Sequence, residues 1–378
     1  MFMIRREIMA GSRQRPNNSS NYVDISSKTQ VVKLYKKKGR AKRIISLVLA
    51  ILFMLTGGGM LYYYHALDLF KYEPNDETVA TMPTKETVEG EDQPGDFNTT
   101  INDSDLLQNS KVLNVMLFGE DNHAKGQTGR SDSMIMMSID NNSQKIKLTS
   151  FQRDTYVWIP GYGYTKLTHA YSYGGASLTI RTIEANFGVK VDRYAVVDFT
   201  SFQKIIDVLG GIELDLSEDE VAYINWQMYI NHQTTERHLL EEKNGIINLT
   251  GQQALWYARD RGYDGIQAGD DWDRTDRQRN LLQTLFNSMR EASLTELISI
   301  VSEVGPLVTT NLKKDEITNL VAHGTTYMKY KVRQYNVPQE GLWGYYRDEN
   351  RISYIQITDM EESRAQFAKF VFGNLLTV

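Results

Sequence analysis

The sequence predicts a layered α/β fold, an α-β-α domain with a central mixed sheet, preceded by a single N-terminal transmembrane helix. Three observations predict it. Residues 44–64 form a run of 21 residues without a charge. Short continuous apolar runs after residue 111 are typical of strands buried on both faces. Helix-like segments alternate with these runs, which favours stacked layers over a bundle or a barrel.

The uncharged run IISLVLAILFMLTGGGMLYYY at residues 44–64 is long enough to cross a bilayer. Residues 1–43 hold 12 Lys and Arg against two acids, and removing this local +10 from the overall −5 leaves −15 for the rest. The positive-inside rule places this basic tail in the cytoplasm and the domain outside a cell membrane crossed once. Because no small-x-small cleavage site follows the run, an uncleaved signal-anchor is favoured over a cleaved signal peptide.

Residues 65–110 carry 11 acids, two lysines and three prolines, which indicates an acidic, extended extracellular linker. The folded domain is then expected over residues 111–378. Its acidic balance would repel a phosphate backbone, which excludes nucleic acid as the main partner. The chain has no cysteine, which fits an envelope without disulfide dependence, as in many Gram-positive bacteria.

Within the domain, strands are predicted at 112–118, 133–140, 145–151, 191–199 and 212–216. Helices are predicted at 176–188, ending at Gly188, at 200–211 with Thr200 as N-cap, and at 359–376, packed against the sheet. Residues 217–247 are read as an irregular helical insertion whose role stays open.

The first chemical cluster is LFGEDNHAKGQTGRSDSMIMMSID, residues 117–140. It places Asp121, Arg130 and Asp132 in a loop between two apolar runs. Paired carboxylates at a sheet edge suit Mg²⁺, which takes oxygen ligands and shares them with phosphates. Taken alone, the cluster is equally described as a turn with a surface ion pair.

The second cluster is SFQRDTYVWIPGYGYTKLTHAYSYGG, residues 150–175. Arg153 and Asp154 close a predicted strand, at the edge of a sheet where ligand crevices form. The Gly, Tyr and Pro residues that follow predict an aromatic loop, with Lys166 in reach. The alternative interpretation is an Arg-Asp pair that only neutralises itself.

The third cluster is LTGQQALWYARDR, residues 249–261, a predicted helix with Thr250 as N-cap and its end near Arg259. Arg259 and Arg261 are two positions apart, so an intact helix would point them in different directions. They face one pocket only if the chain leaves helical geometry between them.

The fourth cluster is DDWDRTDRQRNLLQTLFNSM, residues 270–289, read as a helix that starts near Arg274. Arg274, Arg277 and Gln278 would then occupy its first turn, where acids are the usual choice. Arginines beside a helix N-terminus suit a bound anion. The alternative is a solvated basic face.

Taken together, several arginines and two carboxylates in an acidic domain describe a magnesium-assisted site for pyrophosphate. Arginine binds phosphate oxygens bidentately and stabilises the charge that develops on a leaving group. The sequence holds no G-x-x-x-x-G-K phosphate loop, which argues against a nucleotide.

Four ordered motifs over about residues 112–290 resemble the LytR-CpsA-Psr family of the bacterial envelope. They are NVMLFGEDN with GRSDSMIMMSID, SFQRDTYVWIPGYG with KLTHAYSYGG, YAVVDFTSFQKIIDVLGGIELDL, and LTGQQALWYARDR with DDWDRTDRQRN. The resemblance implies a phosphotransferase, anchored by one helix, that works outside the cell. It would move a glycopolymer (wall teichoic acid, capsule or a rhamnose-rich polysaccharide) from a polyprenyl-pyrophosphate carrier to N-acetylmuramic acid of peptidoglycan. The lipid would lie in an apolar tunnel beneath the sheet.

The resemblance also implies a role for each matched residue. Asp121 and Asp132 would bind Mg²⁺, with Mn²⁺ as a substitute. The pyrophosphate would be held by Arg130, Arg153, Arg259, Arg261, Arg274, Arg277 and Gln278. The chemistry would rest on Arg153, Arg259 and Arg261, with Asp154 and Asp271 as the two candidates for the base.

This chain departs from the family pattern at three places. It has Asn122-His123 after the first aspartate where many relatives have an arginine, and Gln152 before the Arg-Asp pair where a proline is usual. Asp273 stands where the family's Asp-x-Gly-Arg has glycine. None of the three changes removes a predicted ligand, but they leave the catalytic base open.

Three other functions remain open from the sequence. A polyprenyl-pyrophosphate glycan pyrophosphatase would use the same site with water as the acceptor. A membrane-tethered transcriptional attenuator is disfavoured because the basic tail has no helix-turn-helix. A non-catalytic binder of lipid-linked glycan would retain its ligand without turnover. The sequence does not identify the glycopolymer or the oligomeric state.

Overall fold

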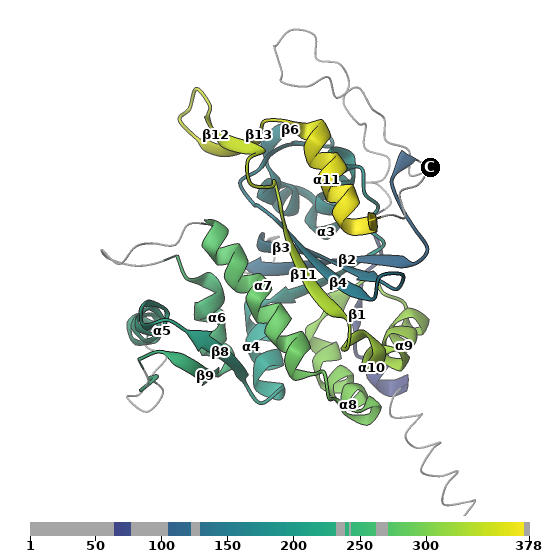
Figure 1. The fold of residues 1–378 in the computed structure, drawn as a ribbon, viewed down its shortest axis with the longest axis vertical. Helices are drawn as coiled ribbons and strands as arrows, with labels where there is room; N and C mark the ends of the chain where they lie inside the picture. Colours follow the sequence, from purple (N-terminus) through teal and green to yellow (C-terminus); the bar gives the residue numbers. More distant parts are fainter. Residues whose placement is uncertain are drawn as a thin grey trace, which may run out of the picture. The chain divides into compact units, whose positions relative to one another are not determined.

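The computed structural model describes residues 64–76, 105–121, 129–231, 239–241, 243–261 and 271–373 (Figure 1). The predicted basic tail (1–43) and nearly all of the predicted anchor (44–64) lie outside the described residues. Within the described ranges, no helix is long and apolar enough to cross a membrane. The domain is therefore described by itself.

The central sheet has the strand order β1-β10-β7-β2-β3-β4-β11. β7 is parallel to β2 and β11 is parallel to β4, whereas β3 is antiparallel to both of its neighbours. The sheet is therefore mixed, and the predicted strands at 112–118, 133–140 and 145–151 are confirmed. Its strands are β1 (Lys71–Tyr72), β2 (Val112–Asp121), β3 (Arg130–Asp140), β4 (Lys145–Phe151), β7 (Arg193–Asp198), β10 (Thr309–Thr310) and β11 (Lys331–Val337).

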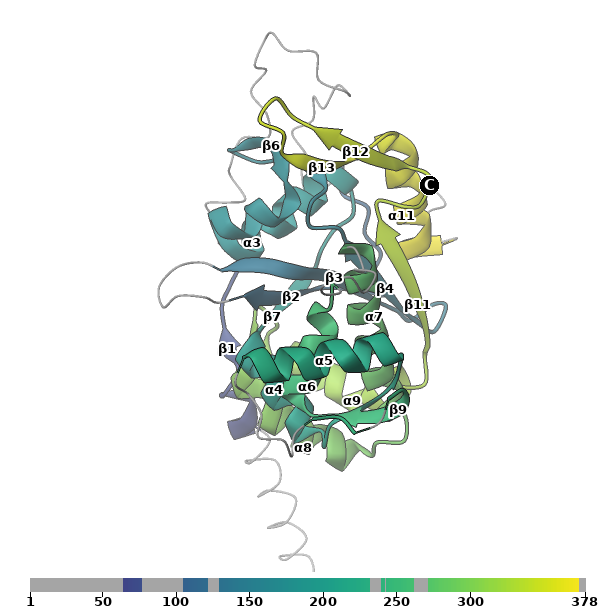
Figure 2. The ribbon, with the colours of Figure 1, turned by 90° about the vertical axis from the view of Figure 1, so that its left-hand side faces the viewer.

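Helices cover both faces of this sheet, which confirms the predicted α-β-α layering (Figures 1 and 2). One face carries α3 (Leu167–Phe187) and α11 (Met360–Phe372), and the opposite face carries α4 (Phe199–Val208), α6 (Gly251–Arg259) and α7 (Asp271–Ser288). The remaining helices are α5 (Glu218–Ile230), α8 (Leu294–Val304), α9 (Lys314–Ala322), α10 (Gly324–Tyr327) and a 3-10 helix, Gly305–Leu307.

The alternation of side chains along β3 divides the two faces. Met134 and Met136 point into the core beneath α3 and α11, whereas Ile135 and Ile139 belong to a cluster on the opposite face. Successive residues of a strand point to opposite faces. A strand that is apolar at consecutive positions is therefore buried on both sides, as the sequence indicates.

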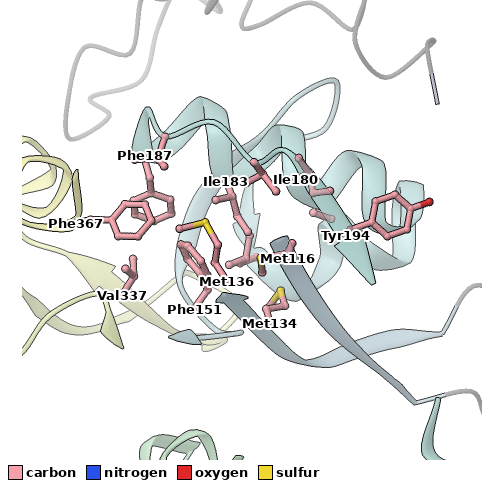
Figure 3. Close-up of a cluster of buried hydrophobic side chains, with 14 of the residues drawn as sticks. Met116, Met134, Met136, Phe151, Ile180, Ile183, Phe187, Tyr194, Val337 and Phe367 are labelled. Atoms are coloured by element: carbon pink, nitrogen blue, oxygen red, sulfur yellow. The ribbon is translucent and has the colours of Figure 1, made fainter. Parts of the chain in front are cut away.

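Aromatic rings fill the core on the α3 and α11 side (Figure 3). The Phe151 ring lies 5.6 Å from the rings of both Phe187 and Phe367. All three side chains are buried. The predicted packing of the C-terminal helix against the sheet is confirmed, because Phe367 and Val371 of α11 belong to this core.

The opposite side depends on one close approach between helices. A Cβ atom at Gly251, the first residue of α6, would lie 2.0 Å from the carbonyl oxygen of Gln203 in α4. Only glycine permits that contact. Gly251 thereby holds the N-terminus of α6 directly against α4.

Three two-stranded antiparallel sheets stand outside the central sheet. They are β5 (Tyr156–Ile159) with β6 (Gly163–Lys166), β8 (Ile212–Leu216) with β9 (Gly245–Leu249), and β12 (Trp343–Arg347) with β13 (Ser353–Ile357). The first corrects the predicted aromatic loop, since Tyr, Gly and Pro form a hairpin followed by the start of α3. The strand predicted at 212–216 exists but pairs with β9. The 217–247 insertion holds α5, which begins with a capping box between Ser217 and Glu220.

Two helix boundaries differ from the prediction. α4 is capped by Asp198, whose side chain accepts a bond from the Ser201 amide, so Thr200 is not the N-cap. α7 extends at least from Asp271, and its first described turn is acidic, so the arginines do not sit at its N-terminus. The predicted helix 176–188 is confirmed, because α3 leaves helical geometry at Gly174 and Gly175 and the part after this kink ends at Gly188 in a left-handed conformation. The part before the kink, from Leu167, was not predicted.

Parts of the predicted linker belong to the domain. Ala66, Leu67 and Leu106 are buried, and β1 pairs with β10 in the central sheet. Leu67 packs with Ile317 and Val321. The expectation of an extended linker over 65–110 is therefore wrong for residues 65–76 and 105–110, because both stretches contain apolar residues that the domain buries.

Candidate functional site

A cavity of about 660 Å³ lies between the sheet and helices α4, α6 and α7. Its walls are mostly apolar, and α4 supplies a continuous stripe of them. The apolar and aromatic lining residues include Leu117, Ile135, Ala195, Val197, Phe199, Phe202, Ile205, Leu255, Trp256, Leu281, Leu282 and Leu285. Such a lining suits a long hydrocarbon better than a polar molecule.

Charged side chains gather at one part of this cavity. Six of the residues predicted from the sequence line it: Asp132, Arg153, Arg259, Arg261, Arg274 and Gln278. They come from β3, the end of β4, the end of α6 and the first turns of α7. Segments separated by more than a hundred residues in sequence therefore meet at one place, as predicted.

Asp132 is presented by an irregularity in β3. Gly119 pairs with Ser133 and Glu120 pairs with Ser131, so Asp132 is the extra residue of a β-bulge. A bulge redirects a side chain away from the regular alternation. The carboxylate of Asp132 accepts a bond of 2.8 Å from Nη1 of Arg153.

Asp271 joins three arginines. Its carboxylate oxygens lie 3.0 Å from Arg153 Nε, 3.0 Å from Arg274 Nη2 and 3.5 Å from Arg261 Nη2. Burial raises the pKa of Asp271 above its ordinary value, and the positive charges of Arg153 and Arg261 only partly oppose this shift. The carboxylate is therefore a better proton acceptor than an exposed aspartate.

Arg153 lies at the centre of the charged group. Burial alone would lower the pKa of its guanidinium, but the carboxylates of Asp271, Asp132 and Asp154 outweigh burial and raise it. Arg153 therefore stays fully charged. It bridges the β3 bulge to α7.

Arg259 and Arg261 reach the same cavity because the chain leaves helical geometry between them, as predicted. α6 ends at Arg259, and Asp260 has φ −58° and ψ 126°. The Arg259 guanidinium lies 4.5 Å from the Phe199 ring centroid and 5.6 Å from that of Trp256. Its Nη2 atom is 3.7 Å from Asp121 Oδ2.

Arg274 and Gln278, one turn apart on α7, carry polar atoms without a partner. Arg274 is 2% exposed. Within the described part of the chain, neither its Nε atom nor Oε1 of Gln278 has a hydrogen-bond partner. An unsatisfied buried donor costs about 1–3 kcal/mol. These two atoms therefore mark a place where a polar ligand would repay that cost.

Five predicted residues are not among those that line the cavity: Asp121, Arg130, Asp154, Asp271 and Arg277. Arg277 donates to Glu220 at 3.0 Å and to the carbonyl oxygen of Asp260 at 2.9 Å. Arg130 is exposed and pairs in register with Asp121. Arg277 is thus part of the scaffold beneath Arg259 and Arg261.

Asp154, the other candidate base, lies beside the cavity lining. Its carboxylate is 3.0 Å from Nζ of Lys166 and 3.7 Å from Nε of Arg153. The prediction that Lys166 is in reach of this pair is confirmed. An ammonium at that distance competes for the lone pairs that a base needs.

The donors for a divalent metal ion are limited. Among the described residues, no group of three or more His, Cys, Asp and Glu side chains could hold a metal ion. Asp121 and Asp132 come from neighbouring strands and face arginines, Arg259 and Arg153. Two carboxylates fit an ion such as Mg²⁺ that keeps several waters and takes its other oxygens from phosphates.

The sequence reasoning missed the residues that build the cavity. Phe199, Phe202 and Ile205 of α4 and Trp256 of α6 line it. The only available signal was the wide apolar stripe of α4, which is also what any core helix shows. It also missed Glu220 and Asp260, which hold Arg277.

The chain is similar in sequence to known proteins. A model described as the LytR_cpsA_psr family matches residues 75–368. The polyisoprenyl-teichoic acid–peptidoglycan teichoic acid transferase TagU of Oceanobacillus iheyensis is 29% identical over 339 residues, covering 88% of this chain and 94% of that protein.

Solved structures share the fold. The crystal structure of Bacillus subtilis TagV is 28% identical with a TM-score of 0.52, and the match covers 70% of this chain and 98% of that one. The LytR-CPS2A-psr family protein YwtF (TagT) with bound octaprenyl pyrophosphate lipid is 22% identical with a TM-score of 0.51, covering 73% and 95%.

Proposed function

The chain belongs to the LytR_cpsA_psr family, and from this membership we propose that it is a phosphotransferase acting on a lipid-linked glycopolymer. It moves the glycopolymer from a polyprenyl-pyrophosphate carrier onto N-acetylmuramic acid of peptidoglycan. The single observation that carries this proposal is an apolar cavity that ends at five predicted anion-binding side chains, Arg153, Arg259, Arg261, Arg274 and Gln278.

The name of a relative indicates which glycopolymer is transferred. TagU of Oceanobacillus iheyensis is named a teichoic acid transferase. This name supports wall teichoic acid as the glycopolymer, ahead of a capsule or a rhamnose-rich polysaccharide. The protein would act at the outer side of a cell membrane, held by residues 44–64.

The polyprenyl chain would occupy the apolar cavity. Its walls, from Leu117 and Ile135 on the sheet to Leu281 and Leu285 on α7, offer hydrocarbon contacts along its length. Transfer of apolar surface from water gains roughly 25 cal/mol per Å². This gain anchors the lipid and leaves the pyrophosphate at the polar part of the cavity.

The pyrophosphate would take the place of the carboxylates that the arginines bond in this structure. Arg153 and Arg274 both bond Asp271, and Arg259 faces Asp121. Guanidinium groups bind phosphate oxygens in pairs of parallel bonds. Nε of Arg274, which has no partner among the described residues, would donate a further bond to the pyrophosphate.

Asp121 and Asp132 would hold Mg²⁺ or, as a substitute, Mn²⁺, on the donor set described above. When bound, the ion supplies charge neutralisation to the phosphate oxygens. Asp132 would stay in contact with Arg153, which keeps the metal side and the arginine side of the site in one arrangement.

The reaction would exchange one P–O bond for another. The C6 hydroxyl oxygen of N-acetylmuramic acid bonds to the phosphorus that carries the glycan, and the bond from that phosphorus to the bridging oxygen breaks. Polyprenyl phosphate leaves with the negative charge, which Arg153 and Arg274 stabilise. A phosphodiester joins the glycopolymer to the acceptor.

Asp271 is the better candidate to accept the hydroxyl proton. Its burial raises its pKa, which favours accepting a proton. A general base must also lie within reach of the acceptor hydroxyl. Asp271 contacts three arginines of the proposed clamp, so a pyrophosphate held by them would bring its phosphorus close to this carboxylate.

The test is a transfer assay with the full chain, a synthetic polyprenyl-pyrophosphate glycan and peptidoglycan oligomers, followed by mass spectrometry. A phosphodiester-linked adduct that needs Mg²⁺ is expected. Asp132→Ala and Arg259→Ala should each abolish it while the circular dichroism spectrum is retained. Unchanged transfer by both variants would contradict the proposal, and phosphorylated glycan released into water would identify a pyrophosphatase instead.

A further inference from the structure

Two aromatic hairpins flank the charged part of the cavity and contribute nothing to its lining. The rings form two separate groups: Tyr156, Tyr346 and Tyr354 contact one another, whereas Trp272 of α7 contacts Trp343 of β12, which contacts Tyr345. The second group, made of Trp272, Trp343 and Tyr345, is here called the aromatic surface. Tyr345 is 68% exposed. We propose that the aromatic surface binds the peptidoglycan glycan strand that serves as the acceptor. This inference rests on the proposed function and names a subsite for it.

The aromatic surface is continuous with the charged cluster along one edge. Trp272 directly follows Asp271 on α7, and its ring stacks on Trp343 with centroids 4.7 Å apart and planes at 25°. Tyr345 meets the Trp343 ring edge-on at 5.2 Å. A chain of rings therefore leads from the carboxylate of Asp271 to open solvent.

A second connection ties the hairpins to the Arg153-Asp154 segment. The backbone amide of Ile355 in β13 donates to the carbonyl oxygen of Asp154 at 2.9 Å. Lys166 of β6 reaches Asp154 at 3.0 Å and lies 5.7 Å from the Tyr354 ring. A ligand held on the hairpins would therefore have a fixed position relative to Arg153.

The chemistry of the exposed rings selects a carbohydrate. Tyrosine and tryptophan present a flat apolar face together with a polar group at the edge. A pyranose ring presents the same combination, with C–H groups on its face and hydroxyls around it. The most exposed ring of the aromatic surface, that of Tyr345, presents such a face to solvent.

The side of the sheet selects the acceptor over the donor glycan. Phosphoryl transfer places the attacking and the leaving oxygen roughly in line. The leaving lipid phosphate belongs to the cavity on the α4, α6 and α7 side. The hairpins β5–β6 and β12–β13 lie on the other side of the sheet, with α3 and α11 (Figures 1 and 2). A hydroxyl that attacks opposite to the leaving group would arrive from the hairpin side.

The proposal is tested by measuring glycan binding and transfer separately with the full chain. The variant is Tyr345→Ala, and the ligand is an uncrosslinked strand of alternating N-acetylglucosamine and N-acetylmuramic acid. Titration calorimetry without donor should show at least about five-fold weaker binding than the wild type. In the transfer assay, the KM for this acceptor should rise by a similar factor while the KM for the lipid donor stays the same.

Two control variants make the result specific. Tyr229→Ala removes a tyrosine that is 74% exposed on α5, and it should change neither quantity. Tyr345→Phe keeps the ring and should restore most of the binding.

Each other outcome has one meaning. Equal strand binding by the wild type and by Tyr345→Ala, or no strand binding by either, would overturn the proposal. A rise in the KM for the donor alone would assign the aromatic surface to the donor glycan and overturn it as well. If the wild type binds the strand but transfers nothing, and Tyr345→Ala loses the binding, the proposed function fails and the binding surface stands.

Discussion

On one face of the central sheet, Phe151, Phe187 and Phe367 pack ring against ring in a filled core. On the other face, Leu117 of β2 and Ile135 of β3 border a cavity of about 660 Å³, whereas Met134, next to Ile135 in β3, faces the filled core. Adjacent positions of one strand thus face a packed core on one side and a cavity on the other. The filled face stabilises the fold through its side-chain contacts, whereas the hollow face lacks such contacts and a bound ligand would provide them.

This difference explains where the charged residues can be placed. A close-packed interior gains dispersion energy from every neighbour and tolerates few polar groups. The hollow face already lacks those contacts, so arginines such as Arg274 can border it when carboxylates pair with them. The predictions below test this comparison, beginning with the largest expected effect.

The matched pair Phe367→Ala and Phe202→Ala compares the two faces directly. Phe367 is fully buried in the filled core, whereas Phe202 lines the cavity and is half-buried. Phe367→Ala should lower the free energy of unfolding by about 3–5 kcal/mol. Phe202→Ala should cost less than about half of that, because part of its surroundings is already open. Urea unfolding measures both, and equal losses would refute the comparison.

Arg153→Ala tests the charged border of the hollow face. It removes the group that bonds Asp132 and Asp271 together, so the transfer rate should fall by about 100-fold or more. Arg153→Lys should recover little, because lysine cannot form two parallel bonds. Arg333→Ala, an exposed arginine of β11, is the control and should transfer at the wild-type rate. The rate is measured with saturating donor.

Ala195→Leu should raise the free energy of unfolding and lower the affinity for the lipid. Ala195 of β7 lines the cavity, and extra methyl groups there would fill empty volume. Unfolding should become harder by about 0.5–1 kcal/mol. Affinity for a polyprenyl pyrophosphate should fall by about ten-fold, since the lipid loses that space. Thermal unfolding and a fluorescent-lipid binding assay measure the two effects, and a stabilised variant with undiminished lipid affinity would contradict the assignment of the cavity.

Two buried aspartates should give opposite pH dependences of stability. Burial would raise the pKa of Asp140, but bonds from Lys147 and Ser143 outweigh it and lower the pKa below 3.8. Lys147 also bonds the Val371 carbonyl of α11, on the filled face. The stability that Asp140 contributes is present above pH 3.8 and is lost as the pH falls through the folded-state pKa.

For Asp271 the sign reverses, because its pKa is raised in the folded state. Stability is greatest below the ordinary value of 3.8 and declines as the pH rises through the higher folded-state pKa. The free energy of unfolding of the wild type minus that of Asp140→Asn should therefore fall on acidification. The same difference for Asp271→Asn should rise. Urea unfolding across this pH range measures both, and parallel trends would contradict the assignment.

The sequence predicted the central strands and the layers well, because consecutive apolar positions such as those of β3 have few structural alternatives. It was less accurate where several residues compete for one role. Asp198 and Thr200 are both good N-caps, and only the tertiary structure selects Asp198. Tyr, Gly and Pro in 155–166 are equally compatible with a loop and with the hairpin β5–β6.

The candidate site shows the same limit. The motifs named Arg153, Arg259 and Arg274, and the structure brings all three to one cavity. Arg277 was grouped with them by helical spacing, yet its partners Glu220 and Asp260 lie on other elements and draw it elsewhere. The cavity itself follows from the distance between α4, α6, α7 and the sheet, which no local pattern encodes.

The pairing of β11 with β4 has a consequence for how the chain folds. The last strand of the sheet and the helix α11 after it complete the filled core, and β1 at the other edge pairs with β10. Both edges of the sheet are therefore closed by segments near opposite ends of the domain. Contacts of such long sequence separation form slowly. During synthesis, which begins at the N-terminus, the edge of β4 stays exposed until the residues up to 337 have been made. Folding is therefore completed only after nearly the whole domain has been synthesised.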